Sequence, residues 1–393
     1  MFFGEFCTKQ TYRADYEYFK KKARKVAALY FRSVEPEILS ESVLRGFTRA
    51  VFLHMGCSEA HAEEAADVLI HADLRGIDSH GVARLSGYVR LWKAGRVNAT
   101  PAFHLSTETP STATLNADGA LGLVSAPHAM RIAIEKARIC GSGWVAVRNS
   151  NHFGIAAHHA LMAAREGMIG FAVTNASPLV TPAGGAERML GTNPVCYAFP
   201  AGEEAPFVLD MATSAASNGK LEIAERKGKP VPEGWLTDQE GNASTDPSAL
   251  RSGGMLLTLG SDPEHGDYKG YGLSSVVDLL SGVLSGANYG PWVPPFVSYL
   301  PVLPDLPGEG IGHFVGAMRV DGFRPLEEYQ QHMDRWIRRF RETKARNSDK
   351  PVLIPGEPEA QAAAYRRDNG IPVNDKVMAD LRQLANDLNL NFA

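Results

Sequence analysis

A histidine, an arginine and a tyrosine stand four residues apart in one short stretch of the sequence. His80 lies within the turn-forming segment Asp73-Leu-Arg-Gly-Ile-Asp-Ser-His-Gly81, and Arg84 and Tyr88 follow that segment. Residues four apart share one face of an α-helix, so a helix that begins at His80 would project all three side chains along one edge. His80 can exchange a proton near neutral pH. The planar guanidinium of Arg84 can bind a carboxylate through two parallel hydrogen bonds.

These residue types suit hydride transfer between a 2-hydroxy acid and its 2-oxo acid. A cation must hold the carboxylate, an acid must protonate the oxygen as hydride arrives, and a nicotinamide cofactor must present the hydride. Arg84 fits the first role and His80 the second, with Ser79 beside the histidine to position the oxygen. The alternative interpretation is a helix-capping serine next to a surface histidine and arginine.

A second histidine lies in the polar segment Asn149-Ser-Asn-His-Phe-Gly154, directly after a predicted strand. Loops at the ends of strands commonly contact ligands in α/β proteins. His152 is therefore a candidate for binding substrate or cofactor, or for acting as the acid in place of His80. The alternative is a turn histidine with local partners only. No zinc-ligand spacing accompanies these histidines, so no metal is expected.

The segment Gly141-Ser-Gly143-Trp-Val-Ala146 matches a dinucleotide-binding motif but follows a helix and precedes a strand, which reverses the Rossmann order. It is interpreted as a helix end and a turn. Two other segments are better candidates for a diphosphate. Thr213 and Ser214 offer donors at a predicted helix start, and Lys269 begins another helix; simple capping and a surface lysine are the alternatives.

The elements that must position these residues follow from hydrophobic periodicity and capping signals. Residues 1–35 predict a basic amphipathic helix. Further helices are predicted at about 40–55, 58–73, 80–92, 126–138, 155–166, 213–226, 269–284, 326–344, 357–369 and 375–388. Strands are predicted at about 144–148, 169–174, 206–209, 255–259 and 312–320, and 228–250 is read as an irregular excursion. The plan is α/β in the middle, with helices at both ends.

Composition narrows the class of protein. The chain has 393 residues, which predicts two domains or one domain with a large insertion. A net charge of −4 provides no excess of positive charge that would predict binding to nucleic acid or to an anionic membrane. The 4 cysteines form no C-x-x-C pair, which favours reduced thiols. No secretory signal and no apolar run long enough for a membrane span are present, so a cytoplasmic protein is expected.

In their order along the chain, the motifs resemble those of the malate/L-lactate dehydrogenase family that lacks the Rossmann fold. The resemblance covers about residues 37–390. It is carried by Asp73-Leu-Arg-Gly-Ile-Asp-Ser-His-Gly-Val-Ala-Arg84, Asn149-Ser-Asn-His-Phe-Gly154, Gly191-Thr-Asn-Pro194, Asp210-Met-Ala-Thr-Ser214, Lys269-Gly-Tyr-Gly272 and Leu353-Ile-Pro-Gly-Glu-Pro358.

The resemblance implies an α/β fold of the non-Rossmann malate/L-lactate dehydrogenase type. A central mixed-sheet domain that binds the cofactor would span 111–310. A helical domain would be built from both chain ends, from 36–110 and from the return strand and helices of 311–393, with 1–35 as an extension. The resemblance also implies a small anionic substrate and a homodimer or higher homo-oligomer, whereas composition predicts no nucleic-acid or membrane partner.

The resemblance assigns roles to individual residues. His80 matches the acid/base histidine, Ser79 and Arg84 its substrate-holding neighbours, and His152 a second active-site histidine that some members are thought to use as the proton acceptor; Tyr88 shares the helix face. NAD or NADP would be contacted by Asp210, Met211, Ala212, Thr213, Ser214, Ala215, Ala216, Tyr268, Lys269, Gly356, Glu357 and Pro358.

The expected reaction is NAD(P)H-dependent interconversion of a small 2-hydroxy acid, of the malate, lactate or ureidoglycolate type, and its 2-oxo acid. Reduction of a cyclic imino acid on the same fold is the nearest alternative, and a non-catalytic metabolite-binding protein is a third. Two segments depart from the family pattern, His158-His159 and Pro291–Pro295. Both can reshape the substrate pocket.

Overall fold

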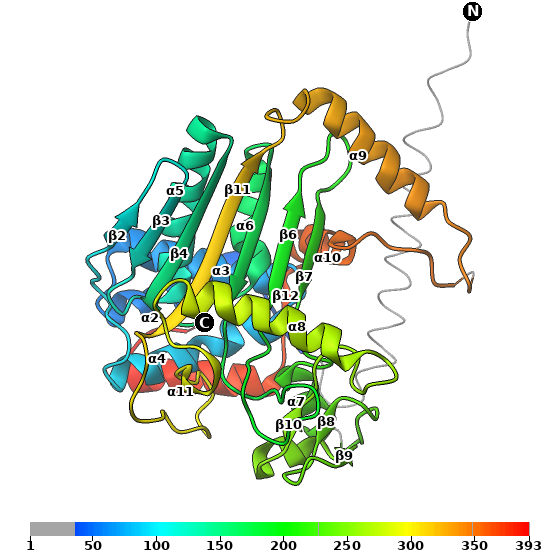
Figure 1. The fold of residues 1–393 in the computed structure, drawn as a ribbon. Coiled ribbons are helices and arrows are strands. Elements are labelled where there is room, and N and C mark those ends of the chain that lie inside the picture. The colour runs from blue at the N-terminus through cyan, green and yellow to red at the C-terminus, as the bar shows by residue number, and fades with distance from the viewer. Residues whose placement is uncertain (1–35, 227, 348, 393) are drawn as a thin grey trace, which may run out of the picture.

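The computed structural model describes residues 36–226, 228–347 and 349–392 (Figure 1). The helix predicted within residues 1–35 lies outside the described residues.

A seven-stranded mixed sheet forms the centre of the molecule, in the order β2-β3-β4-β11-β5-β6-β7. Only the β3–β4 pair is parallel; every other neighbouring pair is antiparallel. The strands are β2 (His104–Glu108), β3 (Thr112–Asn116), β4 (Ser142–Ser150), β5 (Met168–Thr174), β6 (Val195–Phe199), β7 (Phe207–Met211) and β11 (Ile311–Arg319).

The late strand β11 lies in the middle of this sheet, between β4 and β5. It pairs antiparallel with both neighbours, so Val315 faces Val145 on one side and Ala172 on the other. All three residues are fully buried. The central strand is hydrophobic because helices cover both faces of the sheet at this point.

Helices α5 (Gly122–Cys140) and α6 (Ala156–Arg165) pack on one face of the sheet, and α8 (Asp267–Asp278) crosses the other (Figure 1). The π-helical stretch Leu279–Val283 extends α8 and contacts β11. Gly141 ends α5 in the left-handed conformation, with a φ of 85°. This confirms that the Gly141–Ala146 segment is a helix end followed by a strand.

A helical layer combines the two ends of the described chain. It consists of α2 (Glu41–His54), α3 (Glu59–Leu74), α4 (Leu85–Lys93), α10 (Glu357–Asn369) and α11 (Asp375–Leu388). The short strands β1 (Glu37–Leu39) and β12 (Ile371–Val373) pair with each other. One hydrophobic core contains residues from both ends, including Phe52 and Leu381. The expected fold class, with a helical part built from both ends, is confirmed; the domain limits stay predictions.

The structure corrects several predicted elements. The excursion at 228–250 is not irregular, because β8 (Leu236–Thr237) and β9 (Ala243–Ser244) form a small antiparallel sheet with β10 (Met255–Leu256) over a hydrophobic core of its own. Helix α7 is Asn218–Arg226, so it begins five residues after the predicted start at Thr213. Sequence periodicity also missed β6 and the β2–β3 hairpin, whose β2 residues are mostly exposed.

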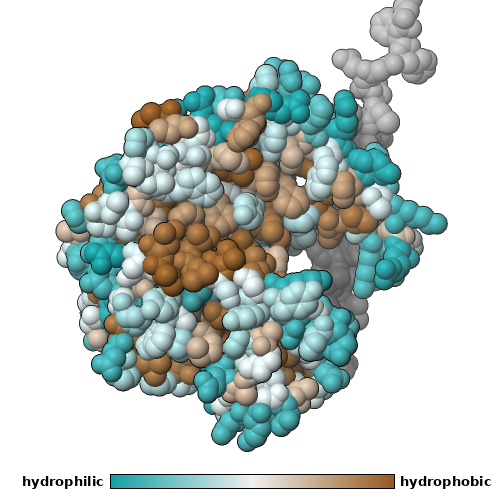
Figure 2. Space-filling model, viewed as in Figure 1, coloured by the Kyte–Doolittle hydropathy of each residue, from teal (hydrophilic) through white to brown (hydrophobic). Residues whose placement is uncertain are grey.

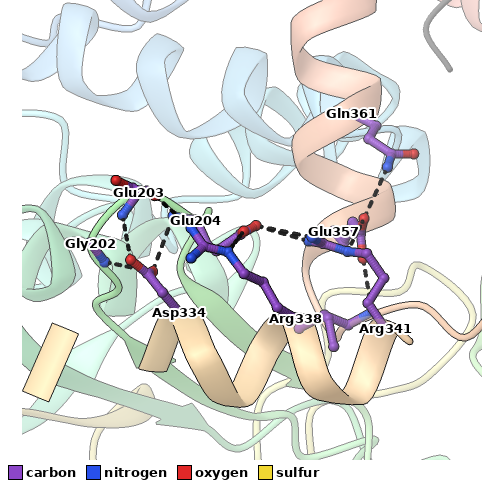
Figure 3. Close-up of polar contacts among 9 residues, drawn as sticks. Gly202, Glu203, Glu204, Asp334, Arg338, Arg341, Glu357 and Gln361 are labelled. Atoms are coloured by element: carbon purple, nitrogen blue, oxygen red, sulfur yellow. Dashed lines mark hydrogen bonds and ion pairs between the residues drawn. The ribbon is translucent and has the colours of Figure 1, made fainter. Parts of the chain in front are cut away.

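Helix α9 (Leu326–Arg341) lies along the edge of the sheet, beyond β6 and β7 (Figure 1). Asp334 on this helix accepts backbone hydrogen bonds from Gly202, Glu203 and Glu204 in the β6–β7 hairpin, at 3.0, 2.8 and 3.1 Å (Figure 3). Three amide donors converging on one carboxylate fix the helix to the hairpin. None of the helices in the described ranges has both the length and the apolar character needed to cross a membrane.

Candidate active site

The turn that carries His80 is not the start of a continuous helix. Asp78–His80 and Val82–Arg84 form two separate 3₁₀ turns, and α4 begins only at Leu85. Gly81 separates the turns because the buried carboxyl of Asp73 occupies the adjacent space; a Cβ on Gly81 would lie 1.9 Å from Asp73 Oδ1. Asp73 Oδ2 also accepts a hydrogen bond of 2.8 Å from Val82 N. The expected single helical edge through His80, Arg84 and Tyr88 is therefore wrong.

The same turn is held from the other end of the chain. Arg366 on α10 donates to the carbonyl of Asp73 and forms an ion pair with Asp78. Its guanidinium thereby joins the C-terminal part of the helical layer to the residues that directly precede Ser79 and His80. Sequence analysis assigned no role to Asp73 or Arg366: Asp73 opens the motif that contains His80 but carries no recognised chemistry there, and Arg366 belongs to none of the motifs.

Tyr88, His152 and His80 nevertheless meet, because His152 lies between the other two. The Tyr88 hydroxyl is 2.7 Å from His152 Nδ1. The rings of His80 and His152 are stacked, with centroids 5.8 Å apart and planes at 20°. The structure thus brings together residues from α4, the β4–α6 loop and the first 3₁₀ turn.

The hydrogen bonds of His152 define which nitrogen carries its proton. Gly154 N lies 3.3 Å from His152 Nδ1, and a backbone N–H can only donate. Nδ1 is therefore an acceptor, for Gly154 and for the Tyr88 hydroxyl. The neutral ring must carry its hydrogen on Nε2, which becomes a donor. This tautomer is assigned from the hydrogen-bond pattern.

His80 has a different arrangement. Its Nδ1 is 2.9 Å from the hydroxyl of Ser79, which can either donate or accept. Burial, and next the positive charge of Arg84, lower the pKa of His80 to about 4. Burial, followed by the charges of His80 and Arg84, lowers the pKa of His152 as well. Both imidazoles are neutral at pH 7, and His80 can present an unprotonated Nε2.

Arg84 has terminal nitrogens available for an anion. Its Nε donates to the Ser79 carbonyl at 2.6 Å, which orients the guanidinium. Among residues 36–226, 228–347 and 349–392, no carboxylate forms an ion pair with it. The side chain is half-buried. A partly desolvated guanidinium with an open fork is suited to bind a carboxylate.

The predicted cofactor segments gather around the end of β7. Thr213 O accepts a hydrogen bond from Leu259 N at 3.0 Å, and Ala215 N donates to Leu257 O at 2.8 Å. Thr258, which lies between Leu257 and Leu259, donates a hydrogen bond from its hydroxyl to Asp267 O at the start of α8, at 3.1 Å. The Asp210–Ala216 segment is therefore connected to the first turn of α8, where Tyr268 and Lys269 lie.

The side chains of this segment are not all free to contact a ligand. Thr213 donates to the Asn193 carbonyl at 3.0 Å, and Ser214 donates to the Ala216 carbonyl at 2.7 Å. Both are buried, and neither lies at a helix start. Asp210 Oδ2 accepts from Ala157 N at 2.8 Å in the first turn of α6. Met211, Ala212 and Ala215 are partly exposed, while Ala216 is buried in the core of the small sheet.

Lys269 and Tyr268 are exposed at the start of α8. The Lys269 amino group lies 5.6 Å from the centre of the Tyr268 ring. Within the described ranges it has no ion-pair partner. A free ammonium group at a helix N-terminus fits the diphosphate of a dinucleotide.

The loop around Gly356, Glu357 and Pro358 is attached to β7. Val208 N donates to Pro355 O at 2.9 Å. Gly356 has a φ of 89° and approaches Val208 so closely that an added Cβ would lie 2.7 Å from the Val208 Cβ. The Glu357 carboxylate accepts from Ile354 N at 3.0 Å, and Arg341 of α9 lies 3.3 Å from it (Figure 3). Glu357 thus holds the shape of its own loop, and Pro358 is exposed.

In the part of the chain that the structure describes, no three His, Cys, Asp or Glu side chains form a group able to bind a metal ion.

The family model described as malate/L-lactate dehydrogenase matches residues 39–382. The chain belongs to the malate/L-lactate dehydrogenase family.

Individual known proteins resemble the chain over most of its length. A malate dehydrogenase from Pyrococcus horikoshii is 42% identical over 87% of this chain and 93% of its own. The crystal structure of a malate dehydrogenase from Entamoeba histolytica matches with a TM-score of 0.84 at 33% identity, covering 91% and 99% of the two chains. A delta1-piperideine-2-carboxylate reductase from Pseudomonas syringae matches with a TM-score of 0.77 at 25% identity, covering 89% and 100%.

Family membership makes the chain an oxidoreductase of the class that acts on hydroxy acids. Dehydrogenases of this family are typically NAD(P)-dependent. The free Lys269 ammonium and the partly exposed end of β7 are compatible with such a cofactor. The cofactor-binding roles of Thr213 and Ser214 stay predictions, and any contact they make would come from their backbone, since their hydroxyls are already bonded to carbonyls.

Proposed function

We propose that this member of the family interconverts a small 2-hydroxy acid and its 2-oxo acid with NAD(P)H. One observation carries the proposal: the open guanidinium fork of Arg84 is adjacent to two neutral imidazoles, His80 and His152, whose Nε2 atoms have no hydrogen-bond partner among the described residues. A carboxylate held by Arg84 would bring the neighbouring 2-oxygen to these nitrogens.

The two histidines would then act differently. His152 Nε2–H donates a hydrogen bond to the substrate oxygen, because Nδ1 is already an acceptor for Tyr88 and Gly154. His80 transfers the proton, with Ser79 able to accept the Nδ1 hydrogen and leave a lone pair on Nε2. The bound nicotinamide supplies or accepts the hydride. Tyr268, Lys269 and the 356–358 loop would hold the cofactor.

The lowered pKa of His80 affects which direction of the reaction the free enzyme is prepared for. A neutral His80 is ready to accept the hydroxyl proton of a 2-hydroxy acid. Reduction requires protonated His80, which the free enzyme disfavours because the site is buried and Arg84 is positive. A substrate carboxylate bound to Arg84 offsets that charge and raises the proton affinity of the imidazole.

An absorbance assay at the nicotinamide wavelength tests the proposal. NADH and NADPH are each offered with pyruvate and oxaloacetate, and NAD and NADP with ureidoglycolate. We expect turnover of at least one 2-oxo or 2-hydroxy acid, with a loss of about 10²- to 10⁴-fold in His80→Ala. Tight binding of NADH without turnover of any of these acids would favour a non-catalytic binding protein instead.

A second candidate is reduction of a cyclic imino acid, which is favoured by the structural match to the piperideine-2-carboxylate reductase. The same Arg84 fork would hold the carboxylate, and nitrogen would replace oxygen as the proton acceptor. Including piperideine-2-carboxylate in the same assay separates the two. A kcat/KM for the imine well above that for every oxo acid would favour this candidate.

We also propose a homodimer. The solvent face of α8 and its π-helical extension exposes a run of apolar side chains, Val276, Leu279, Val283 and Leu284, each 51–58% exposed. Figure 2 shows apolar residues gathered over this part of the molecule. Apolar patches of this kind are typical of subunit interfaces. Ile139 near the end of α5 is 83% exposed and lies outside this run of side chains, so Ile139→Asp is the control. Light scattering is expected to give a dimer for the wild type and for Ile139→Asp, and a monomer for Val283→Asp.

A further inference from the structure

Phe296 lies against the two aromatic residues of the candidate site. Its ring centroid is 4.6 Å from that of His152 and 5.2 Å from that of Tyr88. The residue is half-buried and belongs to the Pro-rich loop that connects α8 to β11. The ring of His152 therefore contacts both the His80 ring and the Phe296 ring.

A glycine in the first turn of α4 makes room for this ring. The position a Cβ would take on Gly87 is 2.6 Å from the tip of the Phe296 ring. Glycine is a less favourable helix residue than alanine. Gly87 nevertheless stands directly beside Tyr88, and its missing side chain leaves the space that the Phe296 ring occupies.

The backbone around Phe296 is held at three points. Ser177 Oγ accepts a hydrogen bond of 2.9 Å from Phe296 N. Arg96 donates to the Pro295 carbonyl at 2.8 Å, and Arg90 donates to the carbonyl of Phe296. The preceding Pro294 and Pro295 further limit the backbone, since proline fixes φ. The ring is thus fixed over His152 rather than resting there by a single contact.

We infer that Phe296 is a wall of the substrate pocket that limits the size of the group attached to the 2-carbon, and so selects small 2-oxo acids. The inference rests on the proposed function and deepens it. Arg84 would hold the carboxylate and the two histidines the 2-oxygen, which leaves the third substituent to occupy the remaining space. Phe296 fills the space beside His152 and excludes a bulky group from it.

The first experiment compares Phe296→Ala with Phe323→Ala, a control whose side chain is 76% exposed. The measured quantity is the ratio of kcat/KM for phenylpyruvate to kcat/KM for pyruvate. Hydrophobic size discrimination commonly amounts to about ten- to a hundredfold, and we expect the ratio to rise by that factor in Phe296→Ala alone. An unchanged ratio, with both substrates slowed equally, would overturn the inference, because a purely structural role slows both alike.

A second variant moves the ring without altering it. Gly87→Ala places a methyl group where the Phe296 ring now lies, so the ring must shift. Gly46→Ala is the matched control, since Gly46 is also inside a helix and has no atom within 4 Å of the added methyl. We expect Gly87→Ala to change the phenylpyruvate-to-pyruvate ratio in the same direction as Phe296→Ala. A ratio equal to that of Gly46→Ala would contradict the inference.

A third measurement needs no turnover. Diethyl pyrocarbonate modifies accessible imidazoles, and mass spectrometry locates the modified residue. We expect His152 to react at least several times faster in Phe296→Ala than in the wild type. His265, whose side chain is 77% exposed, is the control and should react equally in both proteins. If the wild type reduces no 2-oxo acid, the proposed function fails. Equal labelling of His152 in both proteins would instead refute the inference that Phe296 covers His152 as a wall of the pocket.

Discussion

The hydroxyl of Tyr88 lies 2.7 Å from Nδ1 of His152, although 64 residues separate the two along the chain. This contact joins α4 to the β4–α6 loop and places a fully buried phenol behind the imidazole. Because Nδ1 is an acceptor, the contact also directs the His152 N–H toward the candidate substrate position. The orientation of His152 therefore depends on a residue of another element.

Replacing this hydroxyl tests its positioning role. In Tyr88→Phe the ring and its packing remain, but His152 loses one of two hydrogen bonds to Nδ1. A neutral hydrogen bond is worth about 0.5–1.5 kcal/mol, so we expect kcat to fall by about two- to tenfold. The dissociation constant for NADH, measured by fluorescence, should stay unchanged. An equal kcat in variant and wild type would remove Tyr88 from the positioning role.

The pH dependence distinguishes the two histidines. A base must be unprotonated, and the pKa of His80 in the free enzyme is lowered to about 4. The kcat/KM for oxidation of the hydroxy acid should therefore be level above about pH 5 and fall as His80 becomes protonated below it. The kcat/KM for reduction should decline toward high pH. His80→Ala should abolish this dependence, whereas His152→Gln, which keeps a donor, should lower the rate and preserve it.

Arg84→Lys keeps the positive charge and removes the planar fork. A bidentate charged contact contributes about 1.5–3 kcal/mol, so losing it should raise the KM for the 2-oxo acid by about ten- to a hundredfold. The KM for NADH is expected to remain within twofold of the wild type, roughly the level of experimental scatter. If the two KM values rose together, the carboxylate would be bound elsewhere.

Lys269→Ala should have the opposite effect to Arg84→Lys, because it should weaken binding of NADH and not binding of the 2-oxo acid. The ammonium group is exposed at the start of α8 and has no ion-pair partner within the described ranges, so it is free to meet a diphosphate. Removing it should weaken NADH binding by about tenfold, the effect of one charged hydrogen bond. Lys376→Ala, an exposed lysine on α11, serves as the control. Weakened oxo-acid binding with normal NADH binding would contradict this assignment.

Asp73 predicts a pH dependence of stability. Burial raises its pKa to about 8, so the folded protein holds this proton more tightly than the unfolded chain does. The associated stability is complete below about pH 4 and is lost as pH rises toward 8. The buried histidines have lowered pKa values, and their stabilising contribution keeps rising with pH until about one unit above their ordinary pKa of about 6.5. These contributions are shared by Asp73→Asn, so the melting temperature of the wild type, measured relative to that of Asp73→Asn, should fall as the pH rises from about 6.5 to 8.

Much of the local structure could be predicted from the sequence. Helices at 357–369 and 375–388 have the predicted limits, and Ser58 caps α3 by accepting from His61 N at 3.2 Å. The turn at Gly141 was also predicted. Periodicity and capping are properties of residues within a few positions of each other, so a single sequence contains the information.

The chemical types of the candidate site were likewise evident from the sequence, since His80, Arg84 and His152 are recognisable by residue type and order. Their geometry was not. The predicted helix edge fails at Gly81 because the Asp73 carboxyl lies against that glycine. The hydroxyls of Thr213 and Ser214, which were predicted to donate to a diphosphate, instead donate to nearby backbone carbonyls.

The sequence by itself determined the family, most of the helices and the residues able to exchange a proton or bind a carboxylate. Only the tertiary structure decided that Tyr88 orients His152, that Arg366 holds the turn before His80, and that Phe296 fits over Gly87. Each of these contacts joins segments far apart in the chain. Their pairing depends on how helices and strands pack together, which no local pattern of residues encodes.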